Sequence, residues 1–192
     1  MIFNSQFQYI AIKLITEVIR MKNFIKFTFL LILISSLSFA STSLQQIYLN
    51  AGPGLGYDRL LTLEPDSTYT GGFSALNEKI GIKGYGAIID LTGDSIFVYG
   101  ESQLDIDGCV VINGNCGIAA HDNTNSLVTQ CTFYGNQIGI HFMSSGMIEL
   151  VNTIISNNTR YGFACDETSV CVLHYLDSYQ NSQGNFMEWC SG

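Results

Sequence analysis

The chain has 192 residues, of which 47% are hydrophobic and 12% are charged, and its formal net charge is −8. Residues 41–192 are more acidic than the whole, with 15 acidic residues against four basic ones, a difference of −11. Nucleic acids and anionic lipid surfaces are bound mainly through Lys and Arg, so this charge excludes nucleic acid as a partner.

Residues 1–20 precede a second methionine, Met21, and contain no recognisable motif. They are interpreted as an upstream extension with a mis-assigned start, or alternatively as a lengthened n-region of a signal peptide. Neither interpretation gives this segment a function of its own.

Residues 21–40 have the composition of a helical signal peptide. Lys22 and Lys26 precede the uncharged run FTFLLILISSLSFA, which ends in small residues at Ser38 and Ala40. This pattern predicts cleavage near Ala40 and a secreted or cell-surface protein. An uncleaved segment would be the chain's only membrane contact, but its 14 uncharged residues are fewer than the about 20 that a span requires.

Residues 41–58 are predicted to be a flexible N-terminal connection. The glycines of AGPGLGY resemble a phosphate-binding loop only superficially, because Pro53 interrupts them and no lysine follows. Beyond this segment, residues 59–63 read as a strand, residues 64–67 as a turn and residues 69–73 as a second extended segment.

From residue 79 the chain reads as short strands separated by glycine-rich turns, with no helical period. No proline follows Pro65, which favours stacked parallel strands, because proline removes a donor from the ladder. The residues predicted to point inward here are Ile80, Ile82, Ile88, Leu91, Ile96 and Val98.

Residues 104–181 repeat one pattern four times. Its clearest markers are Gly117-Ile118, Gly139-Ile140 and Gly162-Phe163, which are 22 and 23 residues apart. A fixed period of this length predicts a solenoid, whose turns bury their apolar faces only by stacking.

Alternation along each strand assigns the side chains of these repeats to the two faces. Two inward stacks are predicted, Ile118/Ile140/Phe163 and Ala120/Phe142/Cys165. The residues predicted to face outward are Ala119, His121, His141, Met143, Ala164 and Asp166. The recurring turn residues Asn113, Asn136, Asn157 and Asn181 are expected to tolerate left-handed backbone and to bond their neighbours in a ladder.

The segments PDSTYTGGF, KIGIKGYGAIIDLTG, LVTQCTFYGNQIGIHF and IELVNTIISNNTRYGF give the chain a resemblance to secreted right-handed parallel β-helix proteins, the pectate-lyase-like superfamily. The resemblance implies three short strands per turn, right-handed coiling and export. The predicted fold is therefore all-β, a right-handed parallel β-helix of about 22-residue turns over residues 59–192, preceded by the helical signal segment.

The six cysteines fit the repeat better than a disulfide framework. Mostly buried free thiols are expected, although Cys109 and Cys131 would be neighbours on adjacent turns, as a disulfide or as stacked thiols. Cys116 is expected to be a core residue. The disulfide state is left open for all six, Cys109, Cys116, Cys131, Cys165, Cys171 and Cys190, and none of them has zinc-ligand spacing.

The last residues, GNFMEWCSG, supply no polar cap, which solenoid ends usually have. Comparable loops in similar bacterial proteins are followed by more chain. The sequence is therefore expected to be an N-terminal fragment, with further β-helix turns in a full-length protein.

Asp90, Asp94, Asp105 and Asp107 are weak candidates for a Ca²⁺ site, because they are expected to offer carboxylate oxygens on neighbouring turns. The alternative is that they are solvated outward positions. A lyase of the superfamily would also need a nearby base, and Arg160 is the only Lys or Arg after Lys83.

A hydrolase would need paired carboxylates. His121-Asp122 and Asp166-Glu167 fall at equivalent offsets two turns apart, with Met143 between them, and are weak catalytic candidates. The family's adjacent Asp pair, Gly-His and Arg-Ile-Lys motifs are absent.

The expected function is that of an exported, non-catalytic β-helix protein that needs no cofactor and binds carbohydrate or another surface partner along its outer face. The alternative is a polysaccharide hydrolase or lyase whose site is incomplete in this chain.

Overall fold

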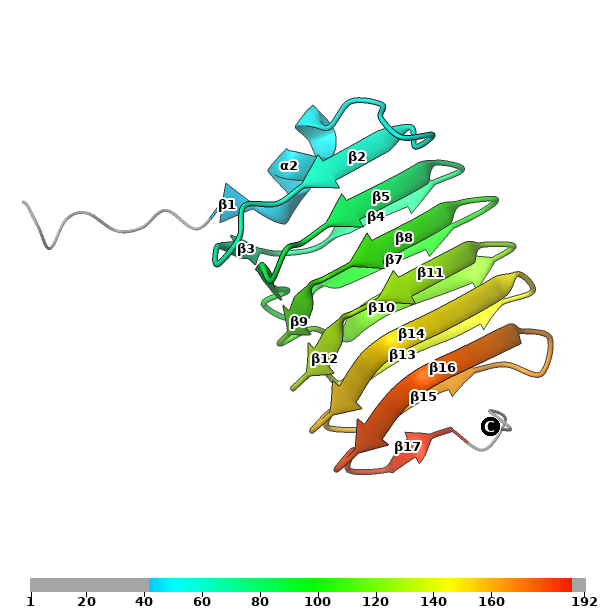
Figure 1. Cartoon of the computed structure of the whole chain (residues 1–192). Helices are drawn as coiled ribbons and strands as arrows, with labels where there is room; N and C mark the ends of the chain where they lie inside the picture. The colour runs from blue at the N-terminus through cyan, green and yellow to red at the C-terminus, as the bar shows by residue number, and fades with distance from the viewer. Residues whose placement is uncertain (1–41, 188–192) are drawn as a thin grey trace, which may run out of the picture. The chain divides into compact units, whose positions relative to one another are not determined.

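The computed structural model describes residues 42–187, which form a solenoid of stacked turns (Figure 1). The predicted signal segment and Cys190 lie outside the described residues. The described part contains 17 strands and one helix: β1 (Thr42–Ser43), α2 (Leu44–Asn50), β2 (Arg59–Thr62), β3 (Thr68–Thr70), β4 (Phe73–Leu76), β5 (Lys79–Lys83), β6 (Ile88–Asp90), β7 (Ser95–Tyr99), β8 (Gln103–Asp107), β9 (Val110–Ile112), β10 (Cys116–Asp122), β11 (Asn125–Thr129), β12 (Thr132–Tyr134), β13 (Ile138–Ser144), β14 (Met147–Ser156), β15 (Tyr161–Cys165), β16 (Val170–Tyr179) and β17 (Gly184–Phe186).

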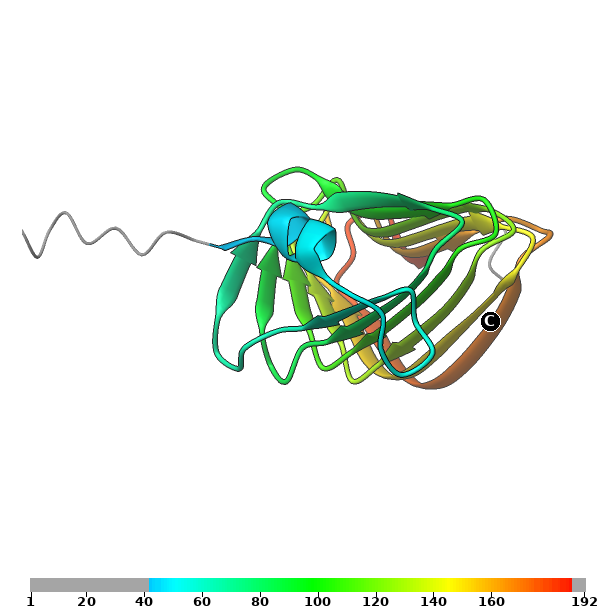
Figure 2. The same ribbon diagram turned by 90° about the horizontal axis from the view of Figure 1, so that it is seen from above.

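Three walls of parallel strands enclose the core, as seen along the solenoid in Figure 2. The first wall contains β2, β5, β8, β11 and the first halves of β14 and β16. The second wall contains β1, β3, β6, β9, β12 and the second halves of β14 and β16, so the first two walls form one 11-stranded sheet. The third wall is a separate six-stranded sheet of β4, β7, β10, β13, β15 and β17.

The register confirms the predicted repeat. Asp105 pairs with Leu127, and Ile118 pairs with Ile140, so these steps along a wall advance the chain by 22 residues. Other steps differ by one or two residues, as in the pairs Arg59 with Ile80 and Ile80 with Leu104. At the corner between the first and second walls, one residue in each of the last four turns has a left-handed backbone, so these turns bend alike and can stack. These corner residues are Gly108 (φ 67°), Gln130 (φ 52°), Asn152 (φ 50°) and Tyr175 (φ 54°).

The two predicted inward stacks are confirmed. Ile140 pairs with Ile118 on one side and with Phe163 on the other, and Phe142 lies in the same way between Ala120 and Cys165. All six side chains are buried in one continuous apolar core. Each turn therefore completes the burial of the turn before it, which is the source of stability in a solenoid.

Two inward assignments were wrong. Ile88 is only half-buried, and Ile89 points into the core in its place, because the turn at residues 84–87 resets the alternation before β6. Cys116 lies not in the core but on the outer side of the third wall, beside Ile138. A break in register between Cys116 and Ile118 gives the inward position to Gly117.

The repeated glycines of the sequence are explained by this inward position. A Cβ atom on Gly117 would lie 2.4 Å from the carbonyl oxygen of Gly139 and 2.5 Å from Cδ1 of Phe133. A Cβ atom on Gly139 would lie 2.5 Å from the carbonyl oxygen of Gly162. Glycine is therefore required here by close backbone approach between turns.

The recurring asparagines separate into two sets, contrary to the single role predicted for them. Asn113 and Asn157 have left-handed backbone, with φ of 57° and 56°. Asn136, Asn158 and Asn181 are instead buried and form a hydrogen-bonded ladder along the solenoid. The Oδ1 atom of Asn136 accepts from the Gly114 N–H at 2.8 Å, that of Asn158 from the Asn136 N–H at 2.9 Å, and that of Asn181 from the Asn158 N–H at 3.0 Å.

Replacement of Asn158 by alanine is expected to lower the free energy of unfolding by about 3 kcal/mol, because it leaves the Asn136 N–H and the Phe133 carbonyl without their buried partner. Urea denaturation monitored by circular dichroism measures the change. Asn157→Gly is the control, since it keeps the left-handed backbone at an exposed neighbour, and it is expected to shift stability by less than about 0.5 kcal/mol. Equal losses in both variants would contradict the ladder.

The predicted flexible connection instead contains a helix that covers the N-terminal end of the core. Ser43 caps α2 by accepting from the Gln46 N–H, and the helix buries Leu44 and Tyr48. The Tyr48 ring stacks on Phe73 at 4.4 Å, and its hydroxyl donates to Glu78, which also pairs with Arg59 at 3.0 Å. Leu44 and Tyr48 belong to the same apolar core, so the helix shields the first turn of the solenoid from solvent.

Free thiols are present at Cys109, Cys116 and Cys131, all of them buried. Cys109 and Cys131 lie on adjacent turns as stacked thiols, and the interaction with Cys131, together with burial, raises the pKa of the Cys109 thiol. Cys165 is buried and Cys171 is half-buried. Within residues 42–187, no helix has the length and apolar character needed to cross a membrane.

Candidate functional site

The outer side of the third wall carries three rows of side chains that run along the solenoid. The strand register places equivalent residues next to one another on successive turns. The first row is Ser95, Cys116, Ile138 and Tyr161. The second is Ser74, Phe97, Ala119, His141 and Ala164. The third is Leu76, Tyr99, His121 and Met143.

Five partly exposed rings in these rows, Phe97, Tyr99, His121, His141 and Tyr161, are called the aromatic strip. Phe97 stacks on Tyr99 with ring centroids 5.0 Å apart and meets His121 edge-on at 5.2 Å. His121 meets His141 at 5.8 Å. The small side chains Ala119 and Ala164 are buried among these larger neighbours and form an apolar surface beside the rings.

Arg160 and His141 set the charge at one end of the aromatic strip. The guanidinium of Arg160 lies 5.9 Å from the centre of the Tyr161 ring. Burial, followed by the neighbouring His121 and Arg160, lowers the pKa of His141 below its usual range. His141 is therefore neutral at pH 7 and presents an uncharged ring.

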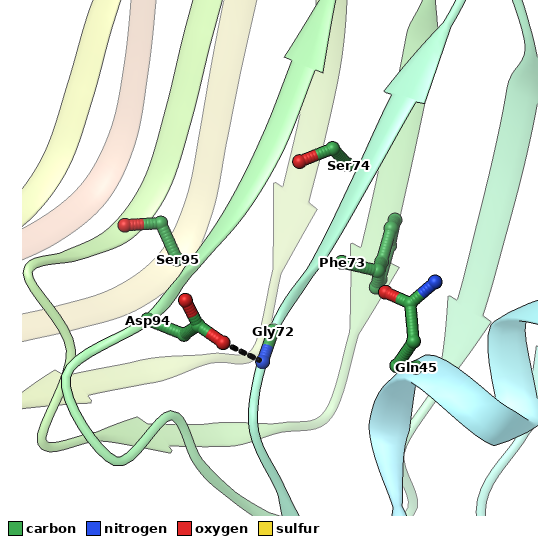
Figure 3. A pocket seen from close by; sticks show the side chains of 6 residues that line it. All are labelled: Gln45, Gly72, Phe73, Ser74, Asp94 and Ser95. Atoms are coloured by element: carbon green, nitrogen blue, oxygen red, sulfur yellow. Dashed lines mark hydrogen bonds between the residues drawn. The ribbon is translucent and has the colours of Figure 1, made fainter.

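A polar pocket of about 210 Å³ lies at the N-terminal end of this outer face (Figure 3). It is lined by Gln45 of α2, by residues at the start of β4, and by Asp94 and Ser95 beside β7. One carboxylate oxygen of Asp94 accepts from the Gly72 N–H at 3.4 Å, and the other is turned away from Gly72. Ser74 lies in register with Phe97, so the polar pocket and the aromatic strip are contiguous.

A second pocket of about 240 Å³ lies at the other end of the same face, lined by Met143, Asp166, Glu167 and Met187. Asp166 accepts from the Thr168 N–H and hydroxyl at 2.9 and 2.7 Å and from the Ser169 hydroxyl at 3.0 Å. These bonds, those of Thr168 first, hold the pKa of Asp166 below its usual range. Asp166 therefore closes a local turn as an ionised acceptor.

The four predicted catalytic residues lie in different surroundings. His121 is in the aromatic strip, whereas Asp122 turns to the Gly100 N–H, which donates to its carboxylate at 2.9 Å. Asp166 and Glu167 line the second pocket together, with Met143 beside them. One strand, with Met143 and Ser144, lies between the two acidic pairs, which is the two-turn separation that their spacing predicted.

The four predicted Ca²⁺ ligands also do not gather in one patch, contrary to the expected placement. Asp90 is in the second wall, where it pairs with Ile112, and Asp94 lines the polar pocket. Asp105 and Asp107 are on β8 in the first wall. Residues 42–187 contain no group of three or more His, Cys, Asp or Glu side chains arranged to hold a metal ion.

Asp105 and Asp107 are engaged with neighbouring side chains. The Tyr57 hydroxyl donates to Asp105 at 2.6 Å, and this bond, with burial, raises the pKa of Tyr57 to about 12. Asp107 pairs with Lys83 at 3.4 Å and accepts from the Thr129 hydroxyl at 2.6 Å. A shallow pocket of about 200 Å³ on this wall is lined by Gln103, Asp105, Asn125, Ser126, Leu127, Met147 and Glu149.

Phe97, Tyr99 and Tyr161 were not predicted as site residues, although Ile96 and Val98 on the same strand as the first two were correctly predicted to point inward. Strict alternation in SIFVY placed both rings outward, and this signal was available. The contribution of Gln45 to the polar pocket depends on where α2 packs, and no local pattern indicated it.

Comparison with known proteins bears on the fold. The family described as right handed beta helix region matches residues 82–191, which is more than half of the chain. No curated protein matches, and no solved structure matches. The chain therefore belongs to the family of right-handed β-helix proteins.

Proposed function

We propose that this chain is an exported, non-catalytic β-helix protein that binds a neutral carbohydrate along the outer face of its third wall. The observation that carries the proposal is the aromatic strip, a row of partly exposed rings beside a polar pocket. Sugar rings have apolar C–H faces and polar edges. Aromatic rings flanked by a few polar groups are suited to such ligands.

The charge of the molecule favours a neutral glycan over a uronate-rich one. Residues 42–187 contain 14 acidic side chains and four basic ones, a difference of −10. A polyanion would be repelled by this field, whereas an uncharged sugar would not. The neutral state of His141 at pH 7 leaves one ring of the aromatic strip uncharged, and Arg160 supplies a cation beside Tyr161.

The geometry of the carboxylates supports a binding role rather than hydrolysis. A general acid needs a raised pKa, whereas the pKa of Asp166 is lowered by its bonds to Thr168 and Ser169. Asp122 accepts from the Gly100 N–H at 2.9 Å. Export is supported by the charged start, apolar run and small residues of the segment 21–40.

Affinity gel electrophoresis with neutral polysaccharides, and with pectate as the charged comparison, tests the proposal. The protein is expected to be retarded by at least one neutral polysaccharide and not by pectate. Phe97→Ala is expected to weaken binding about tenfold or more, because it removes the ring that contacts both Tyr99 and His121.

Tyr134→Ala is the matched control, because Tyr134 is an aromatic residue with 50% exposure on β12 in the second wall, outside the aromatic strip. This variant is expected to bind like the original chain. Equal binding by both variants would contradict the proposed site. Release of soluble sugar from the polysaccharide would instead support the alternative of a polysaccharide-degrading enzyme.

A further inference from the structure

The polar pocket is built from segments that are distant in the sequence. Gln45 comes from α2, Ser74 from β4, Ser95 from β7, and Asp94 from the turn before β7. Figure 3 shows Asp94 directed toward Gly72 before β4, with Gln45 of α2 on the other side of this strand. The pocket therefore exists only when the capping helix and the first turns of the solenoid are assembled together.

The donor and acceptor set of the pocket matches the hydroxyl groups of a sugar. Asp94 supplies an acceptor, the Gln45 amide supplies a donor and an acceptor, and the serine hydroxyls supply both. The Ser95 hydroxyl oxygen already accepts from the Cys116 N–H at 2.9 Å, which fixes its position. A carboxylate accepting from hydroxyl groups makes charge-assisted bonds, the stronger class of hydrogen bond.

The pocket closes one end of the aromatic strip. β4 is the first strand of the third wall, and α2 packs against that end of the core through Tyr48 and Phe73. Gln45, on the first turn of α2, forms a side of the pocket. A glycan lying along the aromatic strip toward β4 therefore reaches Gln45 of α2 at the first strand of the third wall, where a chain end would be received.

We propose that this polar pocket, formed by Gln45, Ser74, Asp94 and Ser95, binds the terminal residue of a neutral glycan whose next residues lie on the aromatic strip. This inference rests on the proposed function, since it concerns the same face. It makes Asp94 and Ser74 the residues that recognise the chain end, and Phe97 the residue that supports the sugar ring next to it.

Isothermal titration with cello-, manno-, galacto- and xylo-oligosaccharides of one to six residues tests this inference. For the series that binds, Asp94→Asn and Ser74→Ala are each expected to weaken binding about tenfold, by the same factor for short and long members, because one residue fills the pocket. Partial acid hydrolysis of the corresponding polysaccharide, which creates chain ends, is expected to increase binding per mass of sugar.

The two proposals fail in distinguishable ways. If Asp94→Asn and Ser74→Ala bind like the original chain while Phe97→Ala does not, the pocket is not a subsite and the inference is overturned. If no oligosaccharide or polysaccharide binds the original chain, the proposed function is overturned as well. Asp94→Asn keeps an acceptor for the Gly72 N–H, and Ser74 is exposed, so both variants are expected to melt at the same temperature as the original chain. This measurement distinguishes a loss of sugar binding from a loss of folded protein.

Discussion

Replacement of Gly117 by alanine is expected to lower the free energy of unfolding by about 3 kcal/mol, the upper range for inserting an atom into a packed core. The new Cβ would lie 2.4 Å from the Gly139 carbonyl oxygen and 2.5 Å from Cδ1 of Phe133. Gly139 is held by its neighbours on the next turn, and Phe133 is fully buried, so neither can move away cheaply. Urea denaturation monitored by circular dichroism measures the change.

Gly52→Ala is the matched control, because a Cβ at Gly52 has no atom within 4 Å and its φ is not in the left-handed region. This variant is expected to be at least as stable as the original chain, since alanine restricts the unfolded state. If Gly117→Ala and Gly52→Ala have the same unfolding midpoint, the close approach between turns at Gly117 is wrong.

Ile140→Asp is expected to be the most damaging single change, with a loss of about 5 kcal/mol or no folded protein at all. Ile140 has 0% exposure and lies between Ile118 and Phe163 on adjacent turns. A carboxylate at this position is surrounded by apolar side chains and has no partner, so it loses its hydration without compensation. Thermal melting at pH 7 gives the comparison with the original chain.

His141→Ala tests the alternation that places Ile140 inside. His141 is the next residue and points outward into the aromatic strip, so its removal is expected to change the free energy of unfolding by less than about 1 kcal/mol. Comparable losses from Ile140→Asp and His141→Ala would show that the inward and outward faces of β13 are wrongly assigned.

The inward and outward faces of the strands could be predicted because the repeated sequence markers show which residues occupy equivalent positions on successive turns. Gly139-Ile140 and Gly162-Phe163 mark equivalent positions, and a period of two residues then assigns each following side chain. Stacking of Ile118, Ile140 and Phe163 follows from these two observations alone. Nothing outside the repeat is needed to place them.

Some local assignments failed because the backbone departs from strict alternation. The register break between Cys116 and Ile118 turns Gly117 inward and Cys116 outward, and sequence spacing does not reveal such a break. Similarly, Asn157 and Asn158 are adjacent, yet one has a left-handed backbone and the other is buried in the ladder. The repeat locates each turn in the sequence only to within one residue, so it cannot tell which of two adjacent asparagines has which role.

The candidate site was only partly predictable for a different reason. The outward direction of Phe97 follows from its neighbours, but its proximity to Ser74 depends on the register between β4 and β7. The pocket also needs Gln45, which α2 brings to the same place from outside the repeat. Contacts of this kind depend on tertiary packing rather than on periodicity.

The most direct test of the account is to locate the bound sugar by two-dimensional NMR of the purified protein, with the neutral oligosaccharide that binds best. The predicted result is that chemical shifts change at Ser74, Phe97, His121 and Tyr161 on the outer side of the third wall. Changes confined instead to the first wall, around the pocket that contains Leu127, would contradict the assignment of the aromatic strip as the binding site.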